Sequence, residues 1–460
     1  MKNNNNSNCP VKKNEVYEVT IVDLTHDGMG VGKVDTYPIF IENAIPGEEV
    51  EVLVLKATKK FAFGKVTNWI KTSPDRVTDV DDKWIRTGIA PLHHMTYEAQ
   101  LRFKQHQVES AMQRIGGFDN ISVAEVVGME EPYAYRNKAQ IPVRKVNREL
   151  ETGFFRKNSH DLVPMENFYI QDPAIDDALV ILKDIMKEYG VKPYDEEKHS
   201  GTLKNIMIRK GHYSNELMVV LVTRKAKIFK VEQMVEEMAE KVPNLVSIVQ
   251  NIHPEKTNVL MSDQFVTLHG RDYIKDTLLG NTYCISASSF YQINTVQAEA
   301  LYTKAIELAE LKPTDTVVDV YCGIGTIGLS LAKQVKQLRG IEMVPQAIRD
   351  AKTNALMNDI ENVEYQVGKA EYIFPEWVEK GIESDVIIVD PPRKGLDAQF
   401  IEASVEMNPD RIIYISCNPG TLARDLKIYA EAGYTTDTVY PFDMFPQTTH
   451  IECLTVLTKK

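Results

Sequence analysis

The chain has no uninterrupted apolar stretch near the roughly 20 residues that a membrane-spanning helix needs. Its first residues, MKNNNNSNCP, contain neither an apolar core nor a cleavage motif of the kind found in signal peptides. We therefore expect residues 1–10 to be a short disordered tail, and the protein to be cytoplasmic and without membrane contact.

Cysteine is also rare. Five occur in 460 residues, none of them in a CxxC pair: Cys9, Cys284, Cys322, Cys417 and Cys453. That usage indicates neither a disulfide framework nor a zinc site. It suits a reducing compartment, where an isolated thiol stays free to react.

Positive charge is in short supply as well, because 53 Lys and Arg stand against 65 Asp and Glu, for a formal net charge of −12. Such a chain is not expected to coat nucleic acid indiscriminately. Residues 133–160 are a local exception, with seven basic and four aromatic side chains against two glutamates. Two interpretations of this segment stay open on its composition alone: a solvated sheet face, or a patch that binds nucleic acid.

Residues 11–70 are strand-like runs separated by glycine turns. Several short strands with regular turns predict a small, OB-like closed β-barrel. One turn gathers side chains suited to single-stranded nucleic acid: Lys56, Lys59, Lys60 and Phe61. Barrels of this kind often bind such strands, and we expect the same use here.

The rest of the chain divides near residue 275. Residues 71–275 mix strand-like and helical runs, including a helix at 97–116, and predict a central α+β domain of mostly antiparallel strands. Over residues 276–460, apolar strands alternate with amphipathic helices. This alternation predicts a Rossmann-like, doubly wound α/β sheet with parallel strands and helices on both faces.

A glycine turn opens this last region, where Gly323, Gly325 and Gly328 satisfy GxGxxG between a strand and a helix. The turn suits either the pyrophosphate of a dinucleotide or the adenosine and methionine portions of S-adenosylmethionine. Acidic residues follow three strands of the region: Asp319, Glu342 and Asp390. They favour S-adenosylmethionine, because a carboxylate can accept hydrogen bonds from the ribose hydroxyls and meet the methionine ammonium. A dehydrogenase stays the alternative.

Cys417 follows the strand RIIYI and precedes the helix TLARDL. The dipole of that helix is expected to lower the thiol pKa from its usual value of about 8.5. A thiolate that adds to carbon 6 of uracil makes carbon 5 nucleophilic enough to take a methyl group, and a base must then remove the carbon-5 proton. Glu452, within an apolar run of the same sheet, is the candidate base, whereas Cys453 faces the other side and is expected in the core.

Several longer motifs accompany these residues: FYQIN, DVYCGIGTIG, GIEM, VDPPRKG, YISCNPGTLARDL and DMFPQTTHIEC. Together with the N-terminal segment, which resembles a TRAM barrel, they make the chain similar to the bacterial RNA uracil-5-methyltransferase family over nearly its full length. The resemblance implies S-adenosylmethionine as cofactor, Cys417 as nucleophile and Glu452 as base. It implies a cofactor pocket lined by Gln292, Tyr321, Thr326, Glu342 and Asp390. It also implies RNA contacts in the central domain, at Arg136, Lys138, Phe155 and Arg156.

One departure from the family narrows the expectation. Many ribosomal-RNA members hold an iron–sulfur cluster on cysteines just before the helix at 97–116, where this chain has Thr87 and Ala90. Because such a cluster needs thiolate ligands, we expect neither a cluster nor another metal. Cluster-free members with a TRAM barrel resemble the Gram-positive enzymes that act on large-subunit RNA. The specific expectation is therefore a monomeric enzyme that methylates one or two loop uridines of 23S ribosomal RNA.

Three further alternatives stay open beside the dehydrogenase. Transfer-RNA members of the family usually lack the TRAM barrel. An RNA cytosine-5-methyltransferase would carry a second cysteine after the DPP proline, where this chain has Pro392 and Arg393. A non-catalytic RNA-binding ribosome assembly factor would need the barrel but not Cys417 or Glu452.

Overall fold

The computed structural model describes residues 9–459, and these form two compact units. Most of the predicted tail, residues 1–10, lies outside the described residues. One unit contains the chain up to Gln107 together with Phe445–Thr449, and the other contains Val108–Met444 and the chain from His450 onward. No helix among the described residues combines the length and the apolar character that crossing a membrane would require.

The first unit contains a closed barrel with the strand order β1-β2-β3-β5-β4. Its strands are β1 (Val16–Leu24), β2 (Gly30–Val34), β3 (Tyr37–Glu42), β4 (Glu49–Ala57) and β5 (Ala62–Lys71). Alternate residues, such as Ile39 and Ile41 of β3, are fully buried and fill the interior. Gly64 is required by this packing, because a Cβ there would lie 2.2 Å from the Val52 side chain. The barrel predicted from the glycine-punctuated strands is confirmed.

Two helices follow the barrel: α1 (Asp82–Thr87) and α2 (Tyr97–Ala111). The last turn of the predicted 97–116 helix is wider, a π-helical turn η1 over Met112–Gly116 that ends at Gly117 in the left-handed conformation. Glycine tolerates that backbone conformation best and commonly ends helices.

The second unit contains a seven-stranded sheet with the order β13-β12-β11-β10-β7-β8-β9. The strands are β7 (Lys138–Val146), β8 (Glu149–Phe155), β9 (Leu162–Pro164), β10 (Leu203–Lys210), β11 (Leu217–Thr223), β12 (Leu245–Ile252) and β13 (Phe265–Gly270). Its helices are α3 (Pro173–Glu188) and α4 (Val231–Lys241). The pairs are antiparallel, as expected, except that β11 and β12 run parallel.

A hairpin of β14 (Tyr273–Leu278) and β15 (Asn281–Ser286) leads to a nine-stranded sheet in the same unit. That sheet contains β6 (Ser122–Val123), β16 (Thr316–Val320), β17 (Gln337–Glu342), β18 (Val363–Val367), β19 (Val386–Val389), β20 (Arg411–Ser416), β21 (Tyr434–Thr435), β22 (Thr438–Phe442) and β23 (Glu452–Lys459). Strands β18-β17-β16-β19-β20 are parallel, which confirms the predicted doubly wound class. The C-terminal β23 instead runs antiparallel between β20 and β22.

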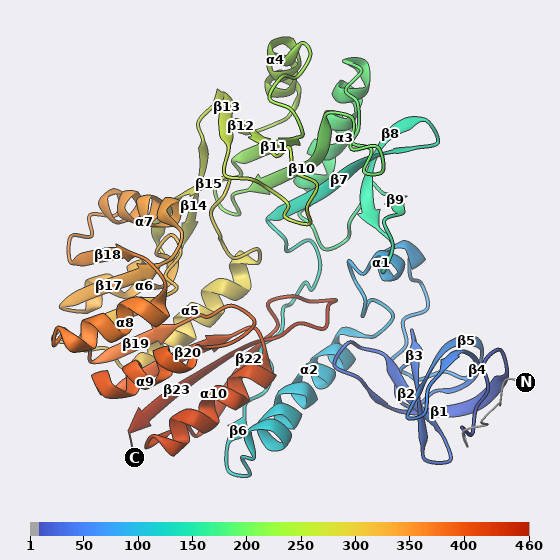
Figure 1. The fold of residues 1–460 in the computed structure, drawn as a ribbon, viewed down its shortest axis with the longest axis horizontal. Helices are drawn as coiled ribbons and strands as arrows, with labels where there is room; N and C mark the ends of the chain where they lie inside the picture. The colour runs from blue at the N-terminus through green and yellow to red at the C-terminus, as the bar shows by residue number, and fades with distance from the viewer. Residues whose placement is uncertain (1–8, 460) are drawn as a thin grey trace, which may run out of the picture. The chain divides into compact units, whose positions relative to one another are not determined.

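Helices cover this sheet on both faces. They are α5 (Thr295–Ala309), α6 (Thr326–Leu331) with its 3₁₀ extension η2 (Ala332–Gln334), α7 (Pro345–Met357), α8 (Ala370–Glu379), α9 (Ala398–Met407) and α10 (Pro419–Glu431). In Figure 1, α8, α9 and α10 lie in front of the orange and red strands, and α5 lies behind them. The short β6 pairs with β22, so this stretch of the predicted central domain belongs structurally to the doubly wound sheet.

Candidate active site

Cys417 directly follows β20 and lies two residues before the first residue of α10. Asn418 caps that helix, because its side-chain oxygen accepts hydrogen bonds from the backbone N–H groups of Gly420 (2.9 Å) and Thr421 (3.4 Å). In the antiparallel pair of β20 and β23, Ser416 is the partner of Cys453. Strand β20 ends at Ser416, and continuing the register by one residue brings Cys417 toward Glu452, whose charge acts on the thiol.

The Glu452 carboxyl is 5% exposed, and its Oε2 has no hydrogen-bond partner among residues 9–459. Burial, followed by the nearby Asp390 carboxylate, raises the pKa of Glu452 well above its usual range, while Arg393 acts in the opposite direction. Burial also raises the pKa of Asp390 to about 7. A carboxylate with a raised pKa is a stronger base than an ordinary one, so in their ionised forms both groups are suited to accepting a proton during a reaction.

The loop after β19 carries Arg393 and is held against α10. The Arg393 carbonyl accepts hydrogen bonds from the Asn418 side-chain amide (3.3 Å) and the Thr421 hydroxyl (3.5 Å). Farther along, the Asp425 carboxylate accepts the backbone N–H of Leu396 at 2.9 Å. The Arg393 guanidinium, which is exposed, lowers the pKa values of both Cys417 and Glu452. It supplies the positive charge of this part of the site.

The expected fall in the Cys417 pKa does not occur. Burial, followed by the negative charges of Glu452 and Asp390, raises the pKa of Cys417 to about 11, and Arg393 offsets only part of that rise. The expectation considered only the start of α10, whose first N–H groups already donate to the Asn418 side chain. The resting site therefore holds a thiol, and its ionisation depends on the neighbouring charges.

This arrangement makes the reactivity of the Cys417 thiol testable without RNA. In Glu452→Gln, loss of a neighbouring negative charge should lower the thiol pKa, so that iodoacetamide alkylation at pH 8 becomes roughly three- to tenfold faster. Mass spectrometry of the Cys417 peptide over pH 7–10 measures the rate. Arg393→Ala should shift the profile in the opposite direction, and equal profiles in all three proteins would contradict the proposed electrostatics.

The glycine turn between β16 and α6 forms a second part of the site. Tyr321, Gly323 and Gly325 all have positive φ, at 68°, 55° and 87°. A left-handed tyrosine is strained, a feature that clusters at functional sites. A Cβ on Gly323 would meet no atom within 4 Å, so this side of the turn is open, whereas one on Gly328 would lie 2.7 Å from the Asp319 carboxylate. The turn therefore combines close helix packing with an accessible backbone.

Three carboxylates lie near this turn, those of Asp319, Glu342 and Asp390. The fully buried Asp319 accepts the backbone N–H of Gly328 at 2.9 Å, and Glu342 accepts those of Gly323 (3.3 Å) and Val344 (2.8 Å). Burial and the charges of Asp390 and Glu342 raise the pKa of Asp319 to about 7. Within the described chain none of the three carboxylates has an ion-pair partner. Such a pocket fits a cofactor with a sulfonium and an ammonium group, which would supply the missing positive charge.

Gln292, the remaining predicted cofactor contact, lies in the loop between β15 and α5. The buried Asn137 side chain holds this loop by donating to the Gln292 carbonyl (2.9 Å) and the Thr295 hydroxyl (3.1 Å). The fully buried Tyr302 hydroxyl interacts with Gln292 and Thr326 and is also close to Asp390. The five predicted pocket residues therefore occupy the end of the sheet at which the parallel strands finish.

Two residues of the site were not identified from the sequence. Tyr302 reads as an ordinary core position of an amphipathic helix. Phe290 is part of the FYQIN motif, yet its 65% exposure on the Gln292 loop is a property of the folded chain. A large exposed aromatic side chain beside the predicted cofactor pocket is available to contact a substrate base.

The predicted RNA contacts separate into two places. Arg136 and Lys138 flank Asn137 beside the Gln292 loop. Burial, followed by Arg209 and Arg136, lowers the pKa of Lys138 to about 7, so this lysine is not part of a freely solvated face. Phe155 and Arg156 lie at the end of β8, where Arg156 is exposed and the Phe155 ring is 5.1 Å from the Arg144 guanidinium.

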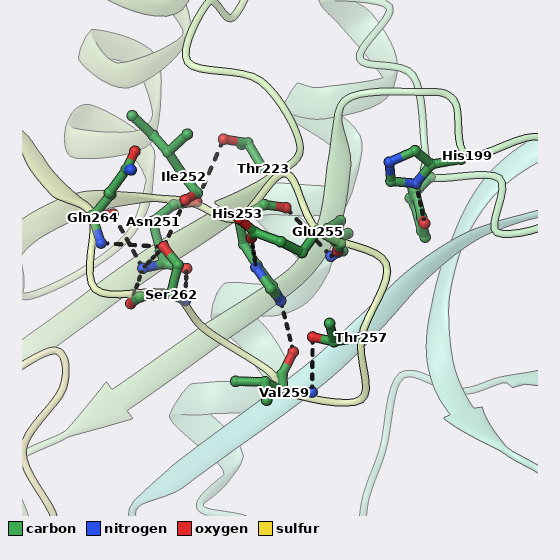
Figure 2. Close-up of polar contacts among 12 residues, drawn as sticks. His199, Thr223, Asn251, Ile252, His253, Glu255, Thr257, Val259, Ser262 and Gln264 are labelled. Atoms are coloured by element: carbon green, nitrogen blue, oxygen red, sulfur yellow. Dashed lines mark hydrogen bonds and ion pairs between the residues drawn. The ribbon is translucent and has the colours of Figure 1, made fainter.

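Arg144 also lines a groove of about 1230 Å³ in the central sheet region. The groove is lined by similar numbers of cations and anions: Arg144, Lys145, Arg148, Lys187, Lys192 and Lys256 against Glu149, Asp161, Asp195, Glu196 and Glu197. Its loop bearing Lys256 is fixed by polar contacts, including His253 Nε2 with the Val259 carbonyl at 2.8 Å (Figure 2). Because its charges nearly balance, the groove by itself shows no preference for a polyanion.

No group of three or more His, Cys, Asp or Glu side chains within residues 9–459 is arranged to hold a metal ion. Cys453 is fully buried, as predicted for a core position. The residues assembled above are therefore a thiol, a carboxyl cluster, an arginine and an open glycine turn.

Comparison with known proteins agrees with a site that contains these groups. The profile of the tRNA (uracil-5-)-methyltransferase family matches residues 96–460, and that of the TRAM domain matches residues 10–67. An uncharacterized RNA methyltransferase of Enterococcus faecalis is 52% identical over 452 residues, 98% of this chain and 99% of the relative. Another, of Streptococcus mutans, is 51% identical over 449 residues, covering 98% and 100%.

Among solved structures, the chain is similar to the Pyrococcus abyssi tRNA (uracil-54, C5)-methyltransferase in complex with S-adenosyl-L-homocysteine. The two are 27% identical with a TM-score of 0.75, and the match covers 96% of this chain and 100% of the other.

Proposed function

Because the chain belongs to the tRNA (uracil-5-)-methyltransferase family and uses S-adenosylmethionine, we propose that it methylates carbon 5 of specific uridines in 23S ribosomal RNA. The observation that carries the proposal is that the Glu452 carboxyl acts electrostatically on the Cys417 thiol where β20 and β23 pair, at the same end of the sheet as the carboxylate-lined glycine turn. Family membership supports this reaction over the dehydrogenase, the cytosine-5-methyltransferase and the non-catalytic alternatives.

The proposed reaction begins at the Cys417 sulfur, which as a thiolate adds to carbon 6 of the target uracil and leaves an enolate with a nucleophilic carbon 5. S-adenosylmethionine, when bound, supplies the methyl group as an electrophile. Glu452 then accepts the carbon-5 proton, and the bond between carbon 6 and sulfur breaks to release the product and restore the thiolate. The site thus needs one thiol that ionises and one carboxylate that can hold a proton.

Arg393 and the neighbouring carboxyl groups determine how readily Cys417 and Glu452 ionise during this reaction. The guanidinium favours the thiolate of Cys417 and the ionised form of Glu452, whereas Asp390 disfavours both. A positive charge bound among Asp319, Glu342 and Asp390 would reduce that opposition, since it counteracts the carboxylates that raise the thiol pKa. Cofactor binding and activation of the nucleophile are therefore electrostatically linked in this proposal.

The cofactor contacts we propose are Gln292, Tyr321, Thr326, Glu342 and Asp390. Glu342 is placed to accept hydrogen bonds from ribose hydroxyls, because its two oxygens lie at the end of β17, next to the glycine turn. Asp319, held by Gly328 beneath the turn, adds negative charge for the methionine ammonium. Tyr321 precedes Gly323 in this turn, and Thr326 begins α6 directly after it.

RNA contacts are proposed at two levels. Arg136 and Lys138 adjoin the loop of Gln292 and Phe290, so they are placed near an extruded uridine and its phosphates. Phe155 and Arg156, at the end of β8, are proposed to contact a segment of the RNA farther from the target uridine. Extrusion costs a few kcal/mol and is least costly for a base that is already unpaired, so a loop uridine is the expected target.

Transfer RNA is the second candidate substrate, because the similar Pyrococcus abyssi structure is a tRNA enzyme. The barrel does not separate the two substrates, since the match to that enzyme covers 96% of this chain. The choice of 23S RNA depends on the missing cluster cysteines, and the absence of an iron–sulfur cluster stays a prediction, as do a cytoplasmic location and a monomeric state.

The substrate assignment is tested by incubating the protein with S-adenosylmethionine and either 23S ribosomal RNA or total tRNA, both from a strain that lacks the gene. We expect 5-methyluridine to appear in 23S RNA in a ratio of one or two per molecule and to be absent from tRNA, as measured by mass spectrometry of nucleosides. Methylation confined to tRNA would replace the proposed substrate, and 5-methylcytidine would overturn the reaction itself.

A further inference from the structure

The loop of residues 443–451 joins β22 to β23 and leads directly to Glu452, the first residue of β23. Glu452 is partnered by Phe442, the last residue of β22. The next residues, Cys453–Thr455, are paired on both sides, with β20 and with β22. Because Glu452 stands at the end of this ladder, the position of its backbone also depends on how the preceding loop is held.

The Glu452 carboxyl has little else to fix its position. Its Oε2 accepts no hydrogen bond from any residue of the described chain. A side chain without that restraint follows the movements of its own backbone. A general base has to lie within hydrogen-bond reach of the proton that it removes, and a displacement of about 1 Å can slow a reaction by about a hundredfold. The anchoring of the loop before Glu452 therefore bears on catalysis.

Two buried glutamines anchor this loop. Gln100 of α2 is fully buried and Gln447 is 4% exposed, and both belong to the first compact unit. The Gln100 side-chain amide donates to the Gln447 side-chain oxygen at 3.0 Å. The Gln100 side-chain oxygen accepts the backbone N–H of Gln447, also at 3.0 Å. The Gln447 carbonyl in turn accepts the backbone N–H of Leu92 at 3.0 Å. The backbone of the loop is therefore bonded on both sides of the Gln447 Cα atom.

The backbone at Gln447 is strained. Its φ of 68° lies in the left-handed region, where a residue other than glycine persists only if its surroundings hold it. Gln100 is suited to this task because its own amide is fixed, donating also to the carbonyls of Leu92 (3.2 Å) and Met95 (3.1 Å). The pair thus imposes a local conformation that the loop would not adopt by itself.

α2 and the barrel also contact the loop at other points. Lys104, one helical turn after Gln100 and fully buried, donates to the Phe445 carbonyl at 3.1 Å. A Cβ on Gly28, in the turn between β1 and β2, would lie 3.1 Å from the Thr449 side chain. Phe445–Thr449 is therefore held along its length by the first unit, and Glu452 follows three residues later in the chain.

We propose that Gln100 is a positioning residue for the reaction, because by fixing Gln447 it holds the chain before Glu452 and so determines where the Glu452 carboxyl lies. This role depends on the proposed function, in which Glu452 removes the carbon-5 proton. A positioning residue should affect that one step and spare the earlier addition of Cys417 to the uracil. A pair of glutamines that only stabilised the fold would affect both steps equally, through the amount of folded protein.

Gln100→Leu in the full-length protein separates these cases, since leucine has a similar size but makes neither hydrogen bond to Gln447. With 23S RNA from the strain that lacks the gene, kcat should fall by about tenfold to a hundredfold while KM stays within about threefold. A covalent protein–RNA complex should accumulate on denaturing gels. With RNA that contains 5-fluorouridine, which has no removable proton at carbon 5, the rate of trapping should stay within about twofold of the wild type.

Two further variants complete the comparison. Ile45→Ala removes buried methyl groups from an apolar cluster of the same unit, so it should lower the melting temperature but leave trapping and release within about twofold of the wild type. Gln447→Gly suits the left-handed backbone but loses the bond from the Gln100 amide, and should slow release selectively by about three- to tenfold even if Gln100→Leu does not fold. Normal release in a folded Gln100→Leu, or equal slowing of trapping and release in Gln447→Gly, would overturn the proposal.

Alkylation of Cys417 by iodoacetamide tests the positioning without RNA. Glu452 acts electrostatically on this thiol, so a displaced carboxyl should change the alkylation rate of Gln100→Leu at pH 8 by about twofold or more. The change should vanish when Glu452→Gln is present in both proteins, because no carboxyl is then left to displace. If RNA is methylated but Gln100→Leu releases it normally, the positioning fails and the reaction stands. If no RNA is methylated but the two substitutions are coupled in this way, the reaction fails and the positioning stands.

Discussion

Replacing Cys417 by serine should lower the rate of uridine methylation by about 10⁴-fold or more, because an alcohol in this position ionises too weakly to add to carbon 6. The substitution exchanges one atom at a half-buried position, so the fold should persist. Single-turnover transfer of a radiolabelled methyl group to RNA measures the loss, and thermal melting verifies the fold.

RNA that contains 5-fluorouridine provides a second measurement of the same residue. Fluorine leaves no removable proton at carbon 5, so wild-type protein should become trapped on the RNA as a complex that survives a denaturing gel. Cys417→Ser should form none, whereas Cys9→Ser, at the other partly exposed cysteine, should trap as the wild type does. Trapping by the Cys417 variant, or residual methylation above about 1% of wild type, would show that another group is the nucleophile.

Replacing Glu452 by glutamine should reduce turnover by about 10²- to 10⁴-fold while the first chemical steps continue. Glutamine keeps the size of the side chain but cannot accept the carbon-5 proton, so the methylated uridine should remain attached to Cys417. With ordinary RNA, a covalent protein–RNA complex should accumulate on denaturing gels. An exposed glutamate on α9, changed in Glu402→Gln, is a control that should leave turnover unchanged.

The pH dependence of the wild-type enzyme follows from the same group. The pKa of Glu452 is raised by burial and by Asp390, and only its ionised form accepts a proton, so resolution of the adduct should slow as pH falls through that pKa. If Glu452→Gln turns over normally, Asp390 becomes the base, because its pKa is about 7 and its charge acts on the same thiol.

Much of the site could be predicted because its parts lie in short segments with strong local preferences. The glycine turn is an example, since Gly325 adopts a positive φ of 87° and Gly328 lies against Asp319. Backbone conformations of this kind select glycine whatever the rest of the chain does. The start of α10 is also predictable from local sequence, because Asn418 and Pro419 are residues typical of a helix N-terminus and directly follow Cys417.

Other features depend on pairings between distant segments. The register that sets Ser416 against Cys453 joins strands far apart in the sequence, and shifting it by one residue would send Glu452 to the opposite face. Asn137 gave no sign of its role either. Its position in a basic, aromatic segment indicated RNA contact, yet its side chain is buried and holds the Gln292 loop.

The sequence by itself determined which chemical groups this protein has: a thiol before a helix, a carboxylate in an apolar strand, acidic strand ends and a glycine turn. These are properties of single residues and their immediate neighbours. Only the tertiary structure decided how those groups are charged. The Cys417 pKa is raised to about 11 because burial and two carboxylates from other strands outweigh the start of its own helix. Desolvation and Coulomb interactions depend on proximity in space, which no local pattern encodes.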